Sequence, residues 1–274
     1  MKKILFASDG SNFSEGSFEF VRRLNDIQPV LLTGVFIPQI TYANLWSYSA
    51  VAAFSGFYPP LPEEEDNKVV ENNIKHFENL CQKNGIAYRI HKDNFDFDFP
   101  ELKKESRFSD VMIISGELFY KRFIEADQDH LREVLHISEC PVLVVPESYQ
   151  FPDNNILAYD GSEESVYAIK QFAYLFPELT KNATLLVYAE NEDDKDFPSK
   201  DYIIELATQH FSDLTFYELE LKSNNYFSAL MIGRKSSILM SGAFSRSALS
   251  QVFKKSFVAA IIRDHQIAVF IAHK

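Results

Sequence analysis

The stretch KILFASDGS at residues 3–11 returns, one residue shorter, as NILAYDGS at residues 155–162. In both copies a short apolar run ends in Asp-Gly-Ser, and apolar residues at helical spacing follow. A second match lies further along the chain, where DVMIISG at residues 110–116 parallels SILMSG at residues 237–242, so that Gly116 corresponds to Gly242. Two matches in the same order predict an internal repeat that spans nearly the whole chain.

Each copy alternates between predicted strands and helices. In the first copy we expect strands at residues 3–7, 30–37, 86–91, 110–115 and 141–145, a first helix that Ser11 can cap, and further helices at 63–84, 100–107 and 131–137. In the second copy we expect strands at 156–159, 183–188, 214–221, 238–241 and 267–271, with helices at 163–176, 200–210, 225–232 and 247–263. This alternation predicts parallel strands with right-handed crossovers. The expected fold is α/β, with two tandem doubly wound parallel-sheet domains at residues 1–150 and 151–274.

Residues 39–62 are an insertion in the first copy. They carry no charge and include six aromatic residues, among them Trp46, the one tryptophan of the chain. Prolines and polar residues interrupt the stretch, whereas a membrane-spanning helix needs about 20 mostly apolar residues. Leaving six aromatic side chains in water is unfavourable, so we expect an ordered cover. This cover can pack on its own domain, close a ligand pocket or contact another molecule. The wavelength of Trp46 fluorescence emission tests whether the segment is buried.

Composition excludes several classes of partner. The net charge of −12 and a pI near 5.1 oppose binding to nucleic acid and to anionic membrane surfaces. Cys81 and Cys140 are the two cysteines, too few for a disulfide scaffold, and the first residues lack an apolar signal core. We therefore expect a cytoplasmic protein without nucleic-acid or membrane partners.

The candidate ligand site lies at the carboxyl ends of the predicted strands. Ligands of doubly wound sheets bind there, at the point where the strand order reverses. Asp9 and Asp160 follow the first strand of each copy, and Gly116 and Gly242 follow a later strand. The alternative is that Asp-Gly-Ser serves only as a turn and a helix cap.

These features resemble the universal stress protein family in its tandem form, with two domains in one chain. The resemblance rests on the strand that ends in Asp-Gly-Ser, the later strand that ends in Gly, and the closing run CPVLVV at residues 140–145. Members of this family commonly dimerise by pairing their last strands. The resemblance thus implies that the strands at 141–145 and 267–271 pair within this chain, which would satisfy both sheet edges.

The resemblance also implies where a nucleotide would bind. Family members that bind ATP carry Gly-x2-Gly-x9-Gly-Ser/Thr after the late strand, where glycines let the backbone approach the phosphates. The first copy begins this motif at Gly116 and continues with Phe119, Asp129 and His130, which oppose a triphosphate by bulk and charge. We therefore expect no ATP there.

The second copy keeps more of the motif. It begins at Gly242 and continues with Ser245, Lys255 and Ser256. By the resemblance, Asp160 would face the nucleoside end, so Asp160, Gly242, Ser245 and Ser256 are the candidate cofactor-binding residues, with ATP or AMP as the possible cofactor. The alternative for Ser256 is a helix N-cap without a ligand.

The sequence presents no residue to which we assign a catalytic or metal-binding role. We expect a non-catalytic stress-response protein that acts through a protein partner, a homodimer or a weakly held small ligand. The alternative is an ATP/AMP-binding regulator or slow ATPase that uses the second domain.

Overall fold

The computed structural model of the chain describes residues 1–9, 12–37, 63–91, 99–116, 135, 137–189, 199–219, 236–242 and 267–272. The predicted insertion at 39–62 lies outside the described residues, as do the predicted helices at 225–232 and 247–263 and most of the helix at 131–137.

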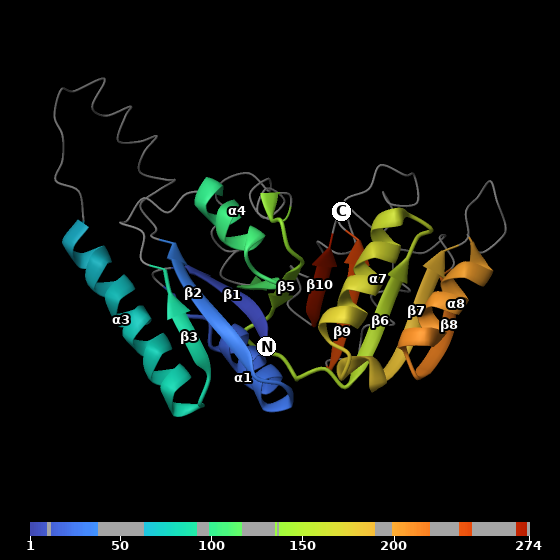
Figure 1. The fold of residues 1–274 in the computed structure, drawn as a ribbon, viewed down its shortest axis with the longest axis horizontal. Helices are drawn as coiled ribbons and strands as arrows, with labels where there is room; N and C mark the ends of the chain where they lie inside the picture. The colour runs from blue at the N-terminus through green and yellow to red at the C-terminus, as the bar shows by residue number, and fades with distance from the viewer. Residues whose placement is uncertain are drawn as a thin grey trace, which may run out of the picture.

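The described strands form one ten-stranded sheet in the order β3-β2-β1-β4-β5-β10-β9-β6-β7-β8 (Figure 1). In chain order they are β1 (Lys2–Asp9), β2 (Val30–Ile37), β3 (Ala87–Ile90), β4 (Val111–Ser115), β5 (Val142–Val145), β6 (Asn154–Tyr159), β7 (Ala183–Ala189), β8 (Asp213–Leu219), β9 (Ser237–Gly242) and β10 (Ala268–Ala272). We call β1–β5 the first half of the sheet and β6–β10 the second half. Both halves have the same internal order, and their pairings are parallel, as predicted.

The two halves meet where β5 pairs with β10. This pairing is antiparallel, with Val144 opposite Val269 and Leu143 opposite Phe270. All residues of both strands are buried, as expected for strands in the middle of a covered sheet. The predicted pairing between the strands at 141–145 and 267–271 is confirmed.

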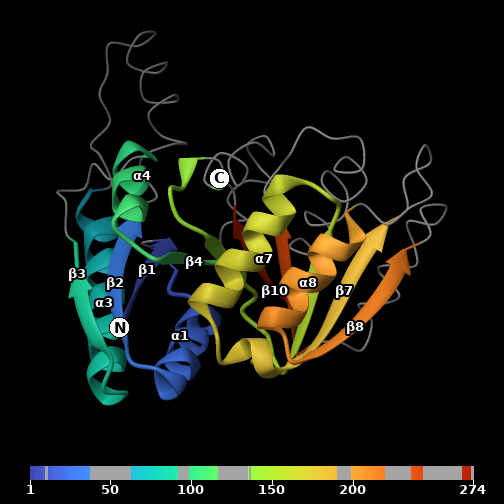
Figure 2. The ribbon, with the colours of Figure 1, turned by 45° about the vertical axis from the view of Figure 1, so that its right-hand side comes forward.

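The described α-helices are α1 (Glu15–Ile27), α3 (Glu63–Lys83), α4 (Phe99–Arg107), α7 (Glu163–Leu175) and α8 (Lys200–His210). In Figures 1 and 2, α7 and α8 lie side by side against the strands of the second half. The sequence predicts each of these helices. In α1 and α3 the apolar residues that recur at helical spacing are buried, as predicted.

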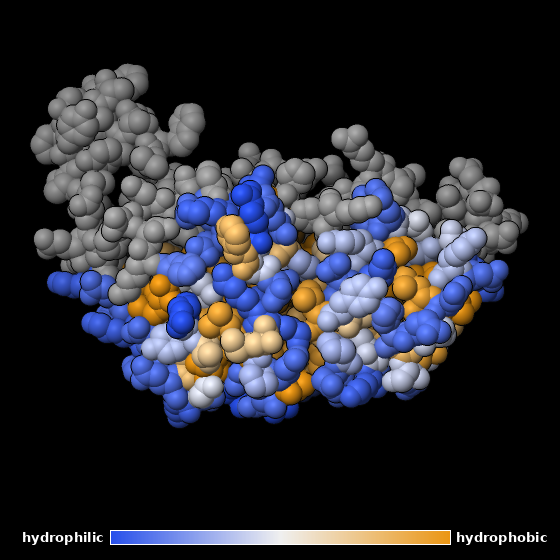
Figure 3. All heavy atoms as spheres, in the orientation of Figure 1, coloured by the Kyte–Doolittle hydropathy of each residue, from blue (hydrophilic) through white to orange (hydrophobic). Residues whose placement is uncertain are grey.

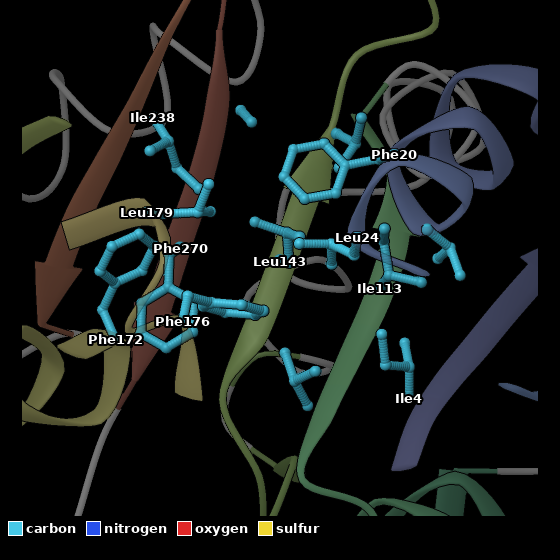
Figure 4. Close-up of a cluster of buried hydrophobic side chains, with 14 of the residues drawn as sticks. Ile4, Phe20, Leu24, Ile113, Leu143, Phe172, Phe176, Leu179, Ile238 and Phe270 are labelled. Carbon is cyan, nitrogen blue, oxygen red and sulfur yellow. The ribbon is translucent and has the colours of Figure 1, made fainter. Parts of the chain in front are cut away.

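One buried hydrophobic cluster extends through both halves (Figure 4). Leu24 of α1 and Leu143 of β5 belong to it, together with Phe176 and Phe270 from the second half. The rings of Phe176 and Phe270 lie 6.0 Å apart between centroids, edge to face. Burial of each such side chain stabilises the fold by about 1.5–3 kcal/mol. Separation of the halves would therefore expose a shared core.

The cap of the first helix differs from the prediction. α1 begins at Glu15, and the side chain of Ser14 caps it by accepting a hydrogen bond from the backbone N–H of Ser17. The prediction that Ser11 caps this helix is wrong. In the second half the serine of the repeated motif is the cap, since Ser162 precedes α7 and its side chain accepts a hydrogen bond from the backbone N–H of Ser165. The repeated motif thus leads into its helix by connections of different length.

The strand register also corrects the repeat. Ile113 in β4 and Met240 in β9 each lie opposite the residue three positions before the Asp of the repeated motif. Both belong to the buried cluster, so they point to the same side of the sheet. Two residues further on lie Ser115 and Gly242. The predicted correspondence of Gly116 with Gly242 is therefore wrong by one residue, because a shift of one would turn every side chain to the other face.

Candidate functional site

Asp160 and Gly242 come together at one edge of the second half. Asp160 directly follows β6, Gly242 ends β9, and these two strands are neighbours in parallel. The chain runs from β6 outward to β7, while β9 lies on the other side of β6, so the strand order reverses at this point. Ser245 and Ser256 lie outside the described residues.

The side chain of Asp160 organises the turn before α7. Its Oδ1 atom accepts hydrogen bonds from the backbone N–H of Ser162 at 3.0 Å and from the hydroxyl of Ser162 at 2.5 Å. Between them, Gly161 has a φ of +77°, a value that glycine adopts without steric strain. The carboxylate thus orients the serine that caps the helix. The geometry accounts for Asp-Gly-Ser here as turn and cap chemistry.

Gly242 is packed against the first turn of α7. A Cβ atom at this position would lie 2.5 Å from the carbonyl carbon of Glu164 and 2.6 Å from the backbone nitrogen of Ser165. Both are backbone atoms that cannot move aside cheaply. Helix packing alone is therefore a sufficient reason for glycine at this place.

In the first half a carboxylate lies on the N-terminus of α1. Glu147, two residues after β5, accepts hydrogen bonds at Oε1 from the hydroxyls of Ser14 at 2.5 Å and Ser115 at 2.6 Å. Its Oε2 atom accepts from the backbone N–H of Gly16 at 3.0 Å. Sequence reasoning missed Glu147. The available signal was a Glu two residues after the closing strand, and its partners at the start of α1 lie 131 and 133 positions earlier in the chain.

A shallow groove of about 630 Å³ lies between α7 and α8. It is lined by Tyr159, Gly161, Ser162, Glu163, Val166, Tyr167, Lys170, Ser199, Tyr202, Ile203 and Leu206. Burial raises the pKa of the Tyr159 phenol, and the neighbouring carboxylate of Asp160 raises that pKa further. The phenol therefore stays protonated at neutral pH. The groove begins beside the turn that Asp160 holds, but neither Asp160 nor Gly242 lines it.

Figure 3 shows the surface on the side of Figure 1. Its described part is mainly hydrophilic, and hydrophobic residues appear in several separate areas. Within the described ranges no helix has the length and apolar composition to cross a membrane.

The chemistry of the cysteines is that of packing residues. Burial raises the pKa of Cys81 and of Cys140 to about 12, so both thiols stay protonated and unreactive at neutral pH. In the part of the chain that the structure describes, no three His, Cys, Asp or Glu side chains gather as a metal ion would require.

No protein-family model matches the chain, and no curated protein matches it in sequence. Solved structures do match it along its whole length. A universal stress protein from Archaeoglobus fulgidus DSM 4304 has a TM-score of 0.66 and 16% identity, with 100% of this chain and 96% of that chain covered. A putative universal stress protein from Pseudomonas aeruginosa UCBPP-PA14 has a TM-score of 0.54 and 10% identity, with 100% and 93% covered. A functionally unknown protein, PA1789 from Pseudomonas aeruginosa PAO1, has a TM-score of 0.54 and 11% identity, with 100% and 92% covered. The chain therefore has the fold of solved universal stress proteins.

Proposed function

We propose that this chain is a universal stress protein of the tandem type, with one domain at residues 1–150 and a second at residues 151–274. The observation that carries the proposal is the strand order, in which two five-strand halves of identical order join through the antiparallel pair β5 and β10. The likeness in fold to a universal stress protein over the whole chain supports it. The two domains would then bind each other through their last strands, within one cytoplasmic chain.

The proposed role is a non-catalytic one in the stress response, exerted through a protein partner, a second copy of the chain or a weakly held ligand. Two features of the second half support it. Gly242 packs against the backbone of α7, so its lack of a side chain serves the fold. Asp160 is engaged by the backbone and hydroxyl of Ser162 and holds a helix cap. Neither feature requires a nucleotide.

The second candidate function is an ATP- or AMP-binding regulator or slow ATPase that uses the second domain. One observation favours it: Asp160 and Gly242 meet where the strand order reverses, which is where doubly wound sheets hold their ligands. Ser245 and Ser256 would then contact the phosphates.

The contents of the purified protein and its activity separate the two functions. Small molecules released when the purified protein is denatured should show neither the absorbance nor the mass of a nucleotide. We also expect the protein to release phosphate from Mg-ATP no faster than buffer does. A stoichiometric nucleotide, or phosphate release that disappears in Ser256→Asp, would establish the second function instead.

A further inference from the structure

The groove between α7 and α8 is lined by apolar side chains and by tyrosines. Val166, Ile203 and Leu206 supply the apolar side chains. Tyr167 and Tyr202 line the groove as well, and Tyr202 is 79% exposed. In Figure 3 hydrophobic residues reach the surface over these two helices, which Figure 1 shows on the near side of the sheet. Tyrosine offers a large contact area and loses little side-chain entropy when a partner fixes it, so it is common in protein-binding surfaces.

A third tyrosine continues this surface towards the other end of the helices. Tyr174 lies seven positions after Tyr167, which puts both residues on the same side of α7. Tyr174 is 58% exposed, and its ring meets the ring of His210 edge to face, 5.3 Å away between centroids. Because His210 is the last residue of α8, Tyr174 contacts the second helix too. We call Tyr167, Tyr174 and Tyr202 the tyrosine face.

The first half shows that the fold does not require these tyrosines. α1 and α7 are both 13 residues long, and each follows directly after a serine cap. Counted from the caps, Glu19 of α1 corresponds to Tyr167. In the same way, Asp26 of α1 corresponds to Tyr174. Arg22 pairs with both of these carboxylates, at 2.6 and 3.0 Å, as residues on a helix surface in water commonly do. The fold alone therefore does not account for the tyrosines of α7.

Charge decides between a second copy of the chain and a different partner. α7 and α8 together carry four carboxylates and two lysines. In the sequence, residues 190–198 directly precede Ser199 of the groove and add five carboxylates and one lysine. The whole chain has a net charge of −12, which makes two copies repel each other. The same charge attracts a cationic partner.

Arginine is the cation that this surface fits best. Its planar guanidinium stacks on the face of a tyrosine ring, whereas the ammonium of lysine is more strongly hydrated. The methylene stem of an arginine can cover Val166 and Leu206 while the guanidinium stays in water. Glu163, in the first turn of α7, offers a carboxylate at one end of the groove, and Lys170 lies seven positions further along the helix. The groove thus presents aromatic, apolar and acidic groups to one kind of side chain.

We propose that the tyrosine face and the groove beside it bind a basic, arginine-containing segment of a partner protein. Guanidinium groups stack on Tyr174 and Tyr202, and carboxylates of the two helices pair with the same cations. The inference names the partner in the proposed non-catalytic role, and it rests on that role being exerted through a protein. The surface includes neither Asp160 nor Gly242, so nucleotide binding and this surface are tested separately.

Labelled hexa-arginine and hexa-lysine, two peptides of equal charge, test the inference by fluorescence anisotropy with the full chain. We expect the wild type to bind hexa-arginine about fivefold more tightly than hexa-lysine, or better. In the double variant Tyr174→Ala, Tyr202→Ala this preference should disappear, because the rings are gone while the net charge is unchanged. Phe108→Ala is the matched control, since it removes an exposed aromatic side chain of the first half and should keep the preference.

The outcomes that would overturn the inference are specific. Equal affinity of the wild type for the two peptides would do so, as would an arginine preference that survives in the double variant. If the double variant does not unfold cooperatively, Tyr202→Ala alone carries the test under the same criterion. Sedimentation should show a monomer. Association of copies that disappears in Tyr202→Ala would assign the tyrosine face to a second copy and overturn the inference as well.

The nucleotide content of the purified protein separates a failure of this inference from a failure of the proposed function. Nucleotide-free protein without the arginine preference would contradict the inference alone. Protein that holds a stoichiometric nucleotide and keeps the preference would establish the second candidate function and leave the arginine-binding surface standing.

Discussion

Val144 of β5 lies directly opposite Val269 of β10, in the antiparallel pair that joins the two halves of the sheet. β5 also pairs in parallel with β4, so Val144 is hydrogen-bonded into a strand with neighbours on both sides. Each five-stranded half would otherwise leave the edge of its last strand unpaired, and in this chain these two edges pair with each other. The buried cluster continues across this junction of β5 and β10, which we call the seam.

A proline at Val144 should break this seam. Val144→Pro removes a backbone N–H from a central strand and leaves a buried carbonyl without its partner, so we expect a loss of about 1–3 kcal/mol in the free energy of unfolding, with aggregation or separation of the halves. Urea unfolding and light scattering measure both effects. Val144→Ala keeps the N–H and should stay monodisperse. A soluble Val144→Pro protein of unchanged stability would count against the pairing.

A side chain at Gly242 should displace α7. Gly242→Ala places a methyl group within 2.6 Å of the backbone of that helix, and we expect a loss of about 1–3 kcal/mol with faster amide exchange in the first turn of α7. Gly85→Ala is a suitable control, since a Cβ there meets no atom within 4 Å, although its φ of +63° adds strain. Unchanged exchange in α7 would refute the packing role of Gly242.

Two serines near α1 should differ in their effect on stability. Ser14→Ala removes the cap and one donor to Glu147, so we expect a loss of about 1 kcal/mol or more in the free energy of unfolding. Ser11→Ala should leave the cap intact and change stability by a few tenths of a kcal/mol at most. Chemical denaturation of both variants gives the comparison. Equal losses would show that Ser11 shares the capping role.

Both thiols should resist modification in the folded protein. Burial raises the pKa of Cys81 and Cys140 from the ordinary 9.0 to about 12, so we expect no reaction with a disulfide reagent at neutral pH until urea unfolds the chain. A folded pKa above the unfolded one contributes stability that is complete below pH 9.0 and is lost as the pH rises towards 12. Urea titrations on both sides of pH 9.0 measure this loss. Rapid labelling of the native protein would contradict the burial.

The sheet could be predicted from sequence because its information is local. Apolar runs and the two Asp-Gly-Ser turns define the strands within two residues at either end. The cap of α1 could not, since Ser11 and Ser14 both precede the helix and only the backbone path selects Ser14. Glu147 could not either, because the seam and the path of the linking segment bring it to Gly16 from 131 positions away. The sequence identifies Gly242 as a candidate residue at the end of a strand. Only the structure shows that a side chain there would collide with the backbone of Glu164.

Calorimetric titration of the wild-type protein with Mg-ATP tests the central claim most directly. The account predicts weak binding or none, because two of the three glycines of the loop motif are absent from each half and a side chain at such a position keeps phosphate from the backbone. A sub-micromolar site would contradict the account. If that affinity disappeared in Ser256→Asp, the loop after β9 would be responsible.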